Sequence, residues 1–345
     1  MHAMNSLPKG PRQLPWFLIS CIILLLLLAG VVIEAIDMPV KSYSGPFLPL
    51  SEQEERLRNR LRSHVHTLAG EIGERNIWKK DKLYDAASYI QQLWQEAGYR
   101  VRLQEYEAKG VTSANLEIEI AGQGPGDEII LVGAHYDSVL GSPGANDNGT
   151  GVATLLEIAE LLKDRDMQRT VRFVAFTNEE PPFFLSRKMG SRVYAMRARQ
   201  RRENIVAMIS LETMGYYSEA PGSQHYPFPF GLFYPHTANF IGFVGNIGSR
   251  HLVRDALAAF RSHARFPSEG TAAPGWLTGI GWSDHWSFWR EGFNAIMITD
   301  TALFRYDPYH TGSDTPEKVD YQRLARVTDG IALVVAELAN AANIR

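Results

Sequence analysis

Hydrophobic and polar residues follow two different periods along residues 51–345. Short apolar runs at 128–133 (EIILVG), 171–177 (VRFVAFT) and 205–211 (IVAMISL) are typical of strands buried on both faces. Between them, residues 150–163 and 189–199 carry apolar side chains at helical spacing. Strands that alternate with helices predict an α/β fold, a three-layer α/β/α sandwich around a largely parallel mixed sheet.

The other elements follow from the same patterns. Ser51 and Glu54 form a capping-box pattern, which predicts a helix that begins there and runs to about residue 72. Residues 216–238 and 269–282 are irregular, and we expect them either to roof a site or simply to pack on the sheet. Further strands are predicted at 100–106, 114–120, 241–244 and 294–299, and further helices at 82–98, 249–263 and 320–342.

Residues 16–33 (WFLISCIILLLLLAGVVI) form an apolar run without a charge. Its length is close to the ~20 residues that cross a bilayer. Lys9 and Arg12 precede the run, and Glu34 and Asp37 follow it, so the positive-inside rule places the N-terminus in the cytoplasm. A cleaved signal peptide and a buried core helix are the alternative interpretations.

This interpretation divides the chain into four parts. Residues 1–15 are a short cytoplasmic tail, 16–36 a transmembrane signal anchor, 37–50 a linker and 51–345 a catalytic domain on the extracytoplasmic side of the membrane. Charged residues make up 21% of the chain and the net charge is −3, without a strong basic cluster, so we expect no nucleic-acid partner.

Candidate chemistry gathers where the apolar strands end. His135 and Asp137 follow the first run, Glu179 and Glu180 follow the second, and Glu212 follows the third. Asp147 lies in the glycine-rich loop GANDNGTG, and His310 lies near the C-terminus. Ligands bind at the carboxyl ends of strands in open α/β sheets.

These side chains suit a divalent metal. The single cysteine, Cys21, lies in the apolar run, so metal ligands in the domain are His, Asp and Glu. We expect His135 to bind a metal, with Asp137 orienting its imidazole. Of the adjacent pair Glu179 and Glu180, one is a ligand and the other a general base.

The chain resembles the M28 family of zinc metallopeptidases. The resemblance covers residue 51 to the C-terminus and rests on GAHYDSV, GANDNGTGVATLLE, VAFTNEE, ISLETMGYY, SDHWSFW and YHTGSDTPE, in this order. It implies a zinc-peptidase (phosphorylase/hydrolase-like) fold and two zinc ions bridged by Asp147 and a water.

The resemblance also assigns a role to each site residue. His135 and Glu212 would bind one zinc ion, and Glu180 and His310 the other. Glu179 would be the general base, Asp137 would orient His135, and Tyr309 would stabilise the tetrahedral intermediate. The family usually has Asp where this chain has Glu212, which is one methylene longer and is also a good zinc ligand.

The expected activity is zinc-dependent hydrolysis of a peptide or small aminoacyl substrate, with aminopeptidase action on a free N-terminus as the first choice. A glutaminyl cyclase-like zinc acyltransferase and a non-catalytic, receptor-like binding ectodomain are the alternatives. Neither the substrate side chain nor the oligomeric state follows from the sequence.

Overall fold

The computed structural model describes residues 19–23, 30 and 34–342. These residues fall into two units, divided between Asp37 and Met38. Most of the predicted anchor at 16–36 lies outside the described residues. Among the residues that are described, none belongs to a helix long and apolar enough to cross a membrane.

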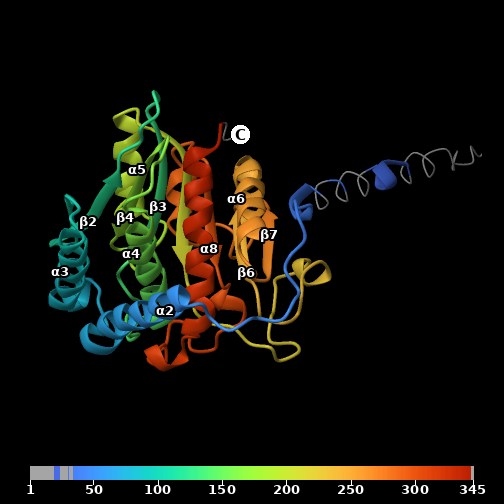
Figure 1. Cartoon of the computed structure of the whole chain (residues 1–345), viewed down its shortest axis with the longest axis horizontal. Helices are drawn as coiled ribbons and strands as arrows, with labels where there is room; N and C mark the ends of the chain where they lie inside the picture. Colours follow the sequence, from blue (N-terminus) through green and yellow to red (C-terminus); the bar gives the residue numbers. More distant parts are fainter. Residues whose placement is uncertain (1–18, 24–29, 31–33, 343–345) are drawn as a thin grey trace, which may run out of the picture. The chain divides into compact units, whose positions relative to one another are not determined.

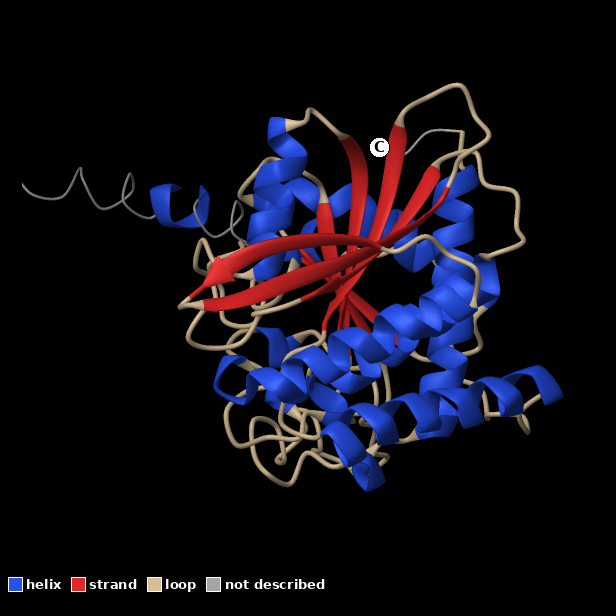
Figure 2. Ribbon diagram, turned by 90° about the vertical axis from the view of Figure 1, so that its left-hand side faces the viewer, coloured by secondary structure: helices blue, strands red, loops and turns tan. Residues whose placement is uncertain are grey.

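The second unit is built on one eight-stranded sheet in the order β1-β2-β4-β3-β5-β8-β6-β7. Figure 2 shows the strands of this sheet in red, with helices around them. Four of its seven pairings are parallel, namely β3 with β4, β3 with β5, β5 with β8, and β6 with β7. The predicted mixed α/β fold is therefore confirmed. The strands are β1 (Arg102–Ala108), β2 (Val111–Ile120), β3 (Glu128–His135), β4 (Thr170–Phe176), β5 (Asn204–Glu212), β6 (Ile241–Gly245), β7 (Ser268–Ala272) and β8 (Ala295–Thr299).

Helices cover both faces of the sheet (Figures 1 and 2). Side chains of α2, α3, α4, α6 and α8 pack on one face, and those of α5 and α7 pack on the other. The helices are α2 (Glu52–Val65), α3 (Lys80–Glu96), α4 (Gly151–Leu162), α5 (Gly190–Gln200), α6 (Arg250–His263), α7 (His285–Trp289) and α8 (Tyr321–Asn340). Shorter helical turns are η1 (His66–Ile72), η2 (Ile77–Lys79), η3 (Ala145–Thr150), η4 (Phe230–Leu232), η5 (Ile247–Ser249), η6 (Ala302–Phe304) and η7 (Pro316–Lys318).

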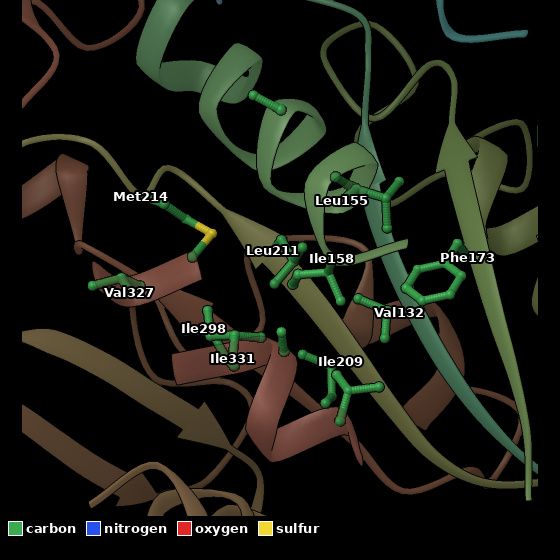
Figure 3. Packing of buried hydrophobic residues seen from close by; sticks show 14 of the residues in the cluster. Val132, Leu155, Ile158, Phe173, Ile209, Leu211, Met214, Ile298, Val327 and Ile331 are labelled. Atoms are coloured by element: carbon green, nitrogen blue, oxygen red, sulfur yellow. The ribbon is translucent and has the colours of Figure 1, made fainter. Parts of the chain in front are cut away.

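The core explains why the central strands are continuously apolar. On β3, Ile130 and Val132 face the larger helical layer, whereas Ile129 and Leu131 face α5 and α7. Figure 3 shows Val132 among Phe173 of β4 and Leu155 and Ile158 of α4. Each such side chain contributes roughly 1.5–3 kcal/mol when it is fully buried, so the central strands are the best anchored part of the sheet.

The structure differs from the sequence prediction at one strand. Residues 269–282 were predicted to be irregular, and this is wrong for β7, which pairs in parallel with β6. The sequence SEGTA has no large apolar side chain, so no hydrophobic pattern marks it as a strand. The helix predicted from residue 51 begins as expected, with Ser51 and Glu54 in a reciprocal capping box, and continues through η1 to Ile72.

Residues 38–42, at the start of the predicted linker, are hydrogen-bonded to the domain. Arg261 of α6 donates to the carbonyls of Pro39 and Val40, and the Ser42 hydroxyl accepts from the backbone N–H of Ser268. These residues therefore lie beside α6 and β7.

Candidate metal centre

Three neighbouring parallel strands bring the predicted site residues to one edge of the sheet. His135 is the last residue of β3, and Glu212 is the last residue of β5. Glu179 and Glu180 follow β4 after a two-residue connection in which Asn178 has a φ of +57°. All four side chains are buried, as are Asp137 and Asp147.

The structure forms two groups of metal-type donors that share Asp147. His135, Asp147 and Glu212 make the first group, and Asp147, Glu180 and His310 make the second. His135 Nε2 lies 3.4 Å from Asp147 Oδ1 and 3.3 Å from Glu212 Oε2. His310 Nε2 lies 3.0 Å from Asp147 Oδ2 and 3.5 Å from Glu180 Oε1. The carboxylate that the resemblance assigned as a bridge thus lies between the two imidazoles.

Asp147 is held by a carboxylate from the far end of the chain. Asp314 accepts hydrogen bonds from the backbone N–H groups of Asn146 (2.8 Å) and Asp147 (3.0 Å). Because Asp314 lies four residues after His310, the same contact fixes the loop that carries the second imidazole. Two segments that carry candidate ligands and lie far apart in the sequence are positioned together in this way.

Asp137 organises the site mainly through the backbone of the glutamate pair. Its two carboxylate oxygens accept the N–H groups of Glu179 and Glu180, each at 3.1 Å. His135 Nδ1 is 3.2 Å from the backbone oxygen of Asp137, whereas the nearest carboxylate oxygen is 3.6 Å away. Asp137 therefore contacts the imidazole through its main chain, and its carboxylate fixes the glutamates.

The electrostatics of this cluster are those of a buried acidic site. Burial and the neighbouring carboxylates raise the pKa of Glu179 and Glu180 well above the ordinary value. Burial also raises the pKa of Glu212. For His135, burial acts to lower the pKa, but the charges of Glu212 and Glu179 outweigh it and raise the pKa well above its usual range.

The donor set fits a divalent cation. His135 Nε2, Asp147 Oδ1 and Glu180 Oε1 are buried and have no hydrogen-bond partner among the described residues. Leaving polar atoms and charges unpaired in the interior is costly, and a cation removes that cost. Imidazole and carboxylate donors, without thiolates, are a combination that zinc accepts.

Tyr309 and an aromatic pocket lie beside the donor groups. The Tyr309 ring stacks on His310 with centroids 3.8 Å apart. Burial, followed by the charge of the site carboxylates, raises the pKa of Tyr309 well above the ordinary value, so the phenol keeps its proton. Tyr309 and Glu212 line one end of the pocket, whose walls include Tyr226, Phe230 and Trp282.

Three supporting residues were not found by sequence reasoning. The Ser283 hydroxyl donates to Glu212 Oε2 at 2.6 Å, and Asp314 holds the Asp147 loop as described. Ser283 lies in the motif SDHW and Asp314 in the motif HTGSDTP. Their polar side chains inside these motifs were the signal from which a supporting role could have been predicted. Arg75 is fully buried and donates to the carbonyls of Tyr136 and Gly144. Nothing in the surrounding sequence marks it.

The fold and the donor groups define an α/β protein with a candidate metal centre at the carboxyl ends of its parallel strands. Residues 115–335 match the model of peptidase family M28. The chain therefore belongs to this family, and the resemblance seen in the sequence is confirmed. It is a hydrolase that acts on peptide bonds.

Two individual relatives align over most of the chain. The chain is 38% identical to the uncharacterized protein YfbL of Escherichia coli, over 83% of this chain and 88% of that protein. It is 25% identical to leucine aminopeptidase 1 of Arthroderma otae, over 76% of this chain and 69% of the relative.

Solved structures share the fold at low sequence identity. A zinc aminopeptidase of Bacillus subtilis superposes with a TM-score of 0.67 and 16% identity, covering 82% of this chain and 95% of that one. A glutaminyl cyclase of Tannerella forsythia has a TM-score of 0.59 and 18% identity, covering 81% of this chain and 98% of that one.

Proposed function

We propose that this protein is a zinc-dependent aminopeptidase. The observation that carries the proposal is the pair of donor groups that share Asp147. His135, Asp147 and Glu212 would hold one zinc ion, and Asp147, Glu180 and His310 the other. Relatives over most of the chain's length, such as the Arthroderma leucine aminopeptidase, support the exopeptidase assignment.

Glu179 acts as the general base. Its carboxylate belongs to neither donor group, yet Oε2 lies 3.9 Å from His135 Nε2, at the edge of the first group. A carboxylate in this place takes a proton from the attacking water and delivers it to the leaving amine. The hydrogen bond from the Glu179 N–H to Asp137 fixes the backbone that carries it.

Tyr309 stabilises the developing oxyanion. Its phenol keeps its proton next to the carboxylates, so it remains a hydrogen-bond donor where negative charge forms on the scissile carbonyl oxygen. Zinc, when bound, would polarise that carbonyl and lower the pKa of a water molecule.

The decisive test is Glu179→Gln, which keeps the shape of the side chain and removes the base. We expect zinc content near two ions per chain, as in the wild type, and a loss of kcat of roughly 10²–10⁴-fold. Elemental analysis and hydrolysis of aminoacyl p-nitroanilides measure the two effects. Wild-type turnover in the variant would refute the assignment of the base.

A substrate panel separates the alternatives. Free-amine substrates, N-blocked substrates and N-terminal glutaminyl peptides are compared with and without a chelator. Chelator-sensitive hydrolysis of the free-amine substrates alone supports the aminopeptidase. Cyclisation of the glutaminyl peptide would favour the cyclase, and no turnover with no bound zinc would favour a binding ectodomain.

We further propose that residues 16–36 anchor the protein in a membrane, with the N-terminus cytoplasmic and the catalytic domain extracytoplasmic. The uncharged run at 16–33 and the flanking charges support this. We expect the full-length chain to stay with the membrane fraction after carbonate extraction, and the domain to be digested by protease added outside the cell membrane. Release of the intact chain by carbonate would contradict the anchor.

A further inference from the structure

One row of residues crosses the sheet from the metal centre to a second carboxylate. Glu212 of β5 pairs with Thr299 of β8, Thr299 pairs with Gly242 of β6, and Gly242 pairs with Glu269 of β7. Paired residues of neighbouring strands point to the same face of a sheet. Three strand spacings of about 4.8 Å separate the two glutamates, which is about 14 Å between their Cα atoms.

Glu269 faces the aromatic pocket rather than the helical layer. A Cβ added to its neighbour Gly270 would contact Leu257 of α6, so Gly270 faces α6 and Glu269 faces the opposite side. Glu269 lines the same pocket as Glu212 and Tyr309, together with Tyr226, Tyr234 and Trp282. The pocket thus extends from the metal centre across β8 and β6 to Glu269.

At the middle of the row, Gly242 lines the pocket and has no side chain. A Cβ there would be crowded, 3.3 Å from the Thr299 carbonyl oxygen and 3.5 Å from Thr301 Cγ2, so glycine keeps this part of the wall at the level of the backbone. Pocket walls on this face include Val244, Ile280 and Met297. This part of the pocket suits the hydrocarbon part of a long ligand side chain, which would pass over Gly242 towards Glu269.

The Glu269 carboxylate has capacity for a ligand. Within residues 34–342 no hydrogen bond to its side chain is present, and 25% of the side chain is exposed. The nearest cation is Arg261, whose Nη2 is 3.8 Å away. Arg261 is only 5% exposed, and its guanidinium donates to Ser268, Pro39 and Val40, so it lies on the protein side of the carboxylate.

We propose that this pocket binds the side chain of the substrate's N-terminal residue and selects a long side chain with a cationic end, arginine or lysine, which Glu269 recognises. The proposal rests on the proposed aminopeptidase function and names its substrate class. The aromatic and aliphatic walls hold the hydrocarbon stem, and the carboxylate receives charge-assisted hydrogen bonds from the guanidinium or ammonium group.

The test compares substrates that differ only in the charge at the end of the side chain. The p-nitroanilide of arginine is compared with that of citrulline, and the p-nitroanilide of lysine with that of norleucine. Each is assayed with the full-length enzyme in the presence of zinc. We expect kcat/KM for arginine to exceed that for citrulline by roughly ten- to hundredfold, which is typical of a hydrogen-bonded charge. In Glu269→Gln this ratio falls to near one. In Glu269→Lys it falls below one, so that citrulline is the better substrate.

Two controls show whether a change in the ratio is due to the Glu269 carboxylate itself. Glu219→Gln removes an exposed carboxylate outside the pocket, which pairs with Arg323, and should leave the ratio unchanged. The two substrates of each ratio are assayed with the same enzyme preparation. Partial unfolding therefore lowers the apparent kcat/KM of both substrates by the same factor and leaves the ratio unchanged.

Several outcomes would overturn the inference. If the wild type cleaves citrulline and norleucine substrates as well as their cationic partners, the pocket does not select charge, although the aminopeptidase function stands. If Glu269→Gln keeps the wild-type ratio, a group other than Glu269 recognises the cationic end of the substrate side chain. If no free-amine substrate is cleaved, the proposed function itself fails and this inference with it.

Discussion

At the scale of single residues, Arg75 shows how a buried charge fixes the site. Its side chain is fully buried, and it donates to the carbonyls of Tyr136, Gly144, Leu68, Gly73 and Pro143. Burial lowers its pKa to about 10, and the carboxylates of the site oppose this effect. Arg75 therefore joins η1, the end of β3 and the loop before Asp147, and its charge partly balances the acidic cluster.

We expect Arg75→Met to lower the free energy of unfolding by about 3–5 kcal/mol, since it leaves several buried carbonyls without a donor. Arg75→Lys should lose less, because an ammonium still supplies three donors. Urea denaturation measures both. Arg58→Met is the control, because Arg58 is only partly buried and its side-chain hydrogen bonds, among the described residues, go to the exposed side chain of Asn59. Equal stability of the Arg75→Met and Arg58→Met variants would show that the buried hydrogen bonds contribute little.

At the scale of elements, a partly buried ion pair joins α2 to α4. Glu157 of α4 is 3% exposed and accepts hydrogen bonds from Arg60 Nε (2.8 Å) and from the ring of His64 (3.0 Å). Burial acts to raise the pKa of Glu157, but His64 and Arg60 outweigh it and the pKa is lowered. The contact holds the first helix of the domain on the helix that follows the Asp147 loop.

Glu157 therefore stabilises the folded state in a pH-dependent way. Because its pKa is lower in the folded than in the unfolded chain, the stabilisation is present above the unfolded value of about 4.3 and is lost as the pH falls through the folded value. We expect Glu157→Gln to cost about 1.5–3 kcal/mol at pH 7. The gap to the wild type should shrink below about pH 4.

Urea midpoints between pH 7 and pH 3 check this expectation. Glu160→Gln is the matched control on the same helix, since Glu160 is exposed. A gap between the wild type and Glu157→Gln that stays constant with pH would mean that the carboxylate charge does not contribute to the contact.

The sequence predicted the strands that have a strong hydrophobic pattern. It did not predict the strand that forms only because a neighbouring strand pairs with it. The runs of β3, β4 and β5 are apolar because both faces are buried, and this is visible in the sequence. β7 contains only small and polar residues, and it exists because β6 offers it a hydrogen-bonding edge. No local signal in SEGTA records that partner.

At the scale of the whole molecule, the candidate ligands tie distant segments together. They come from β3, the η3 loop, the segment after β4, the end of β5 and the loop before η7, between residues 135 and 310. A cation that binds only the folded arrangement stabilises it by mass action, by about 2.7 kcal/mol at a hundredfold excess over Kd.

Removal of zinc should therefore lower the melting temperature. We expect a chelator to reduce Tm by roughly 5–10 °C and added zinc to restore it. Calorimetry with parallel metal analysis measures this. In His310→Ala, which removes one donor of the second group, the chelator should have a smaller effect. An unchanged Tm after complete loss of the metal would show that the site does not couple to folding.

The sequence by itself determined the fold class, the central strands and the residue types of the candidate site, because buried strands and their polar ends leave a local pattern. The tertiary structure decided which groups meet: that Asp147 lies between two imidazoles, that Asp314 and Arg75 support its loop, and that Glu269 ends a row beginning at Glu212. These contacts join segments that lie far apart in the sequence, 168 positions in the case of Asn146 and Asp314, and therefore leave no periodic trace along the chain.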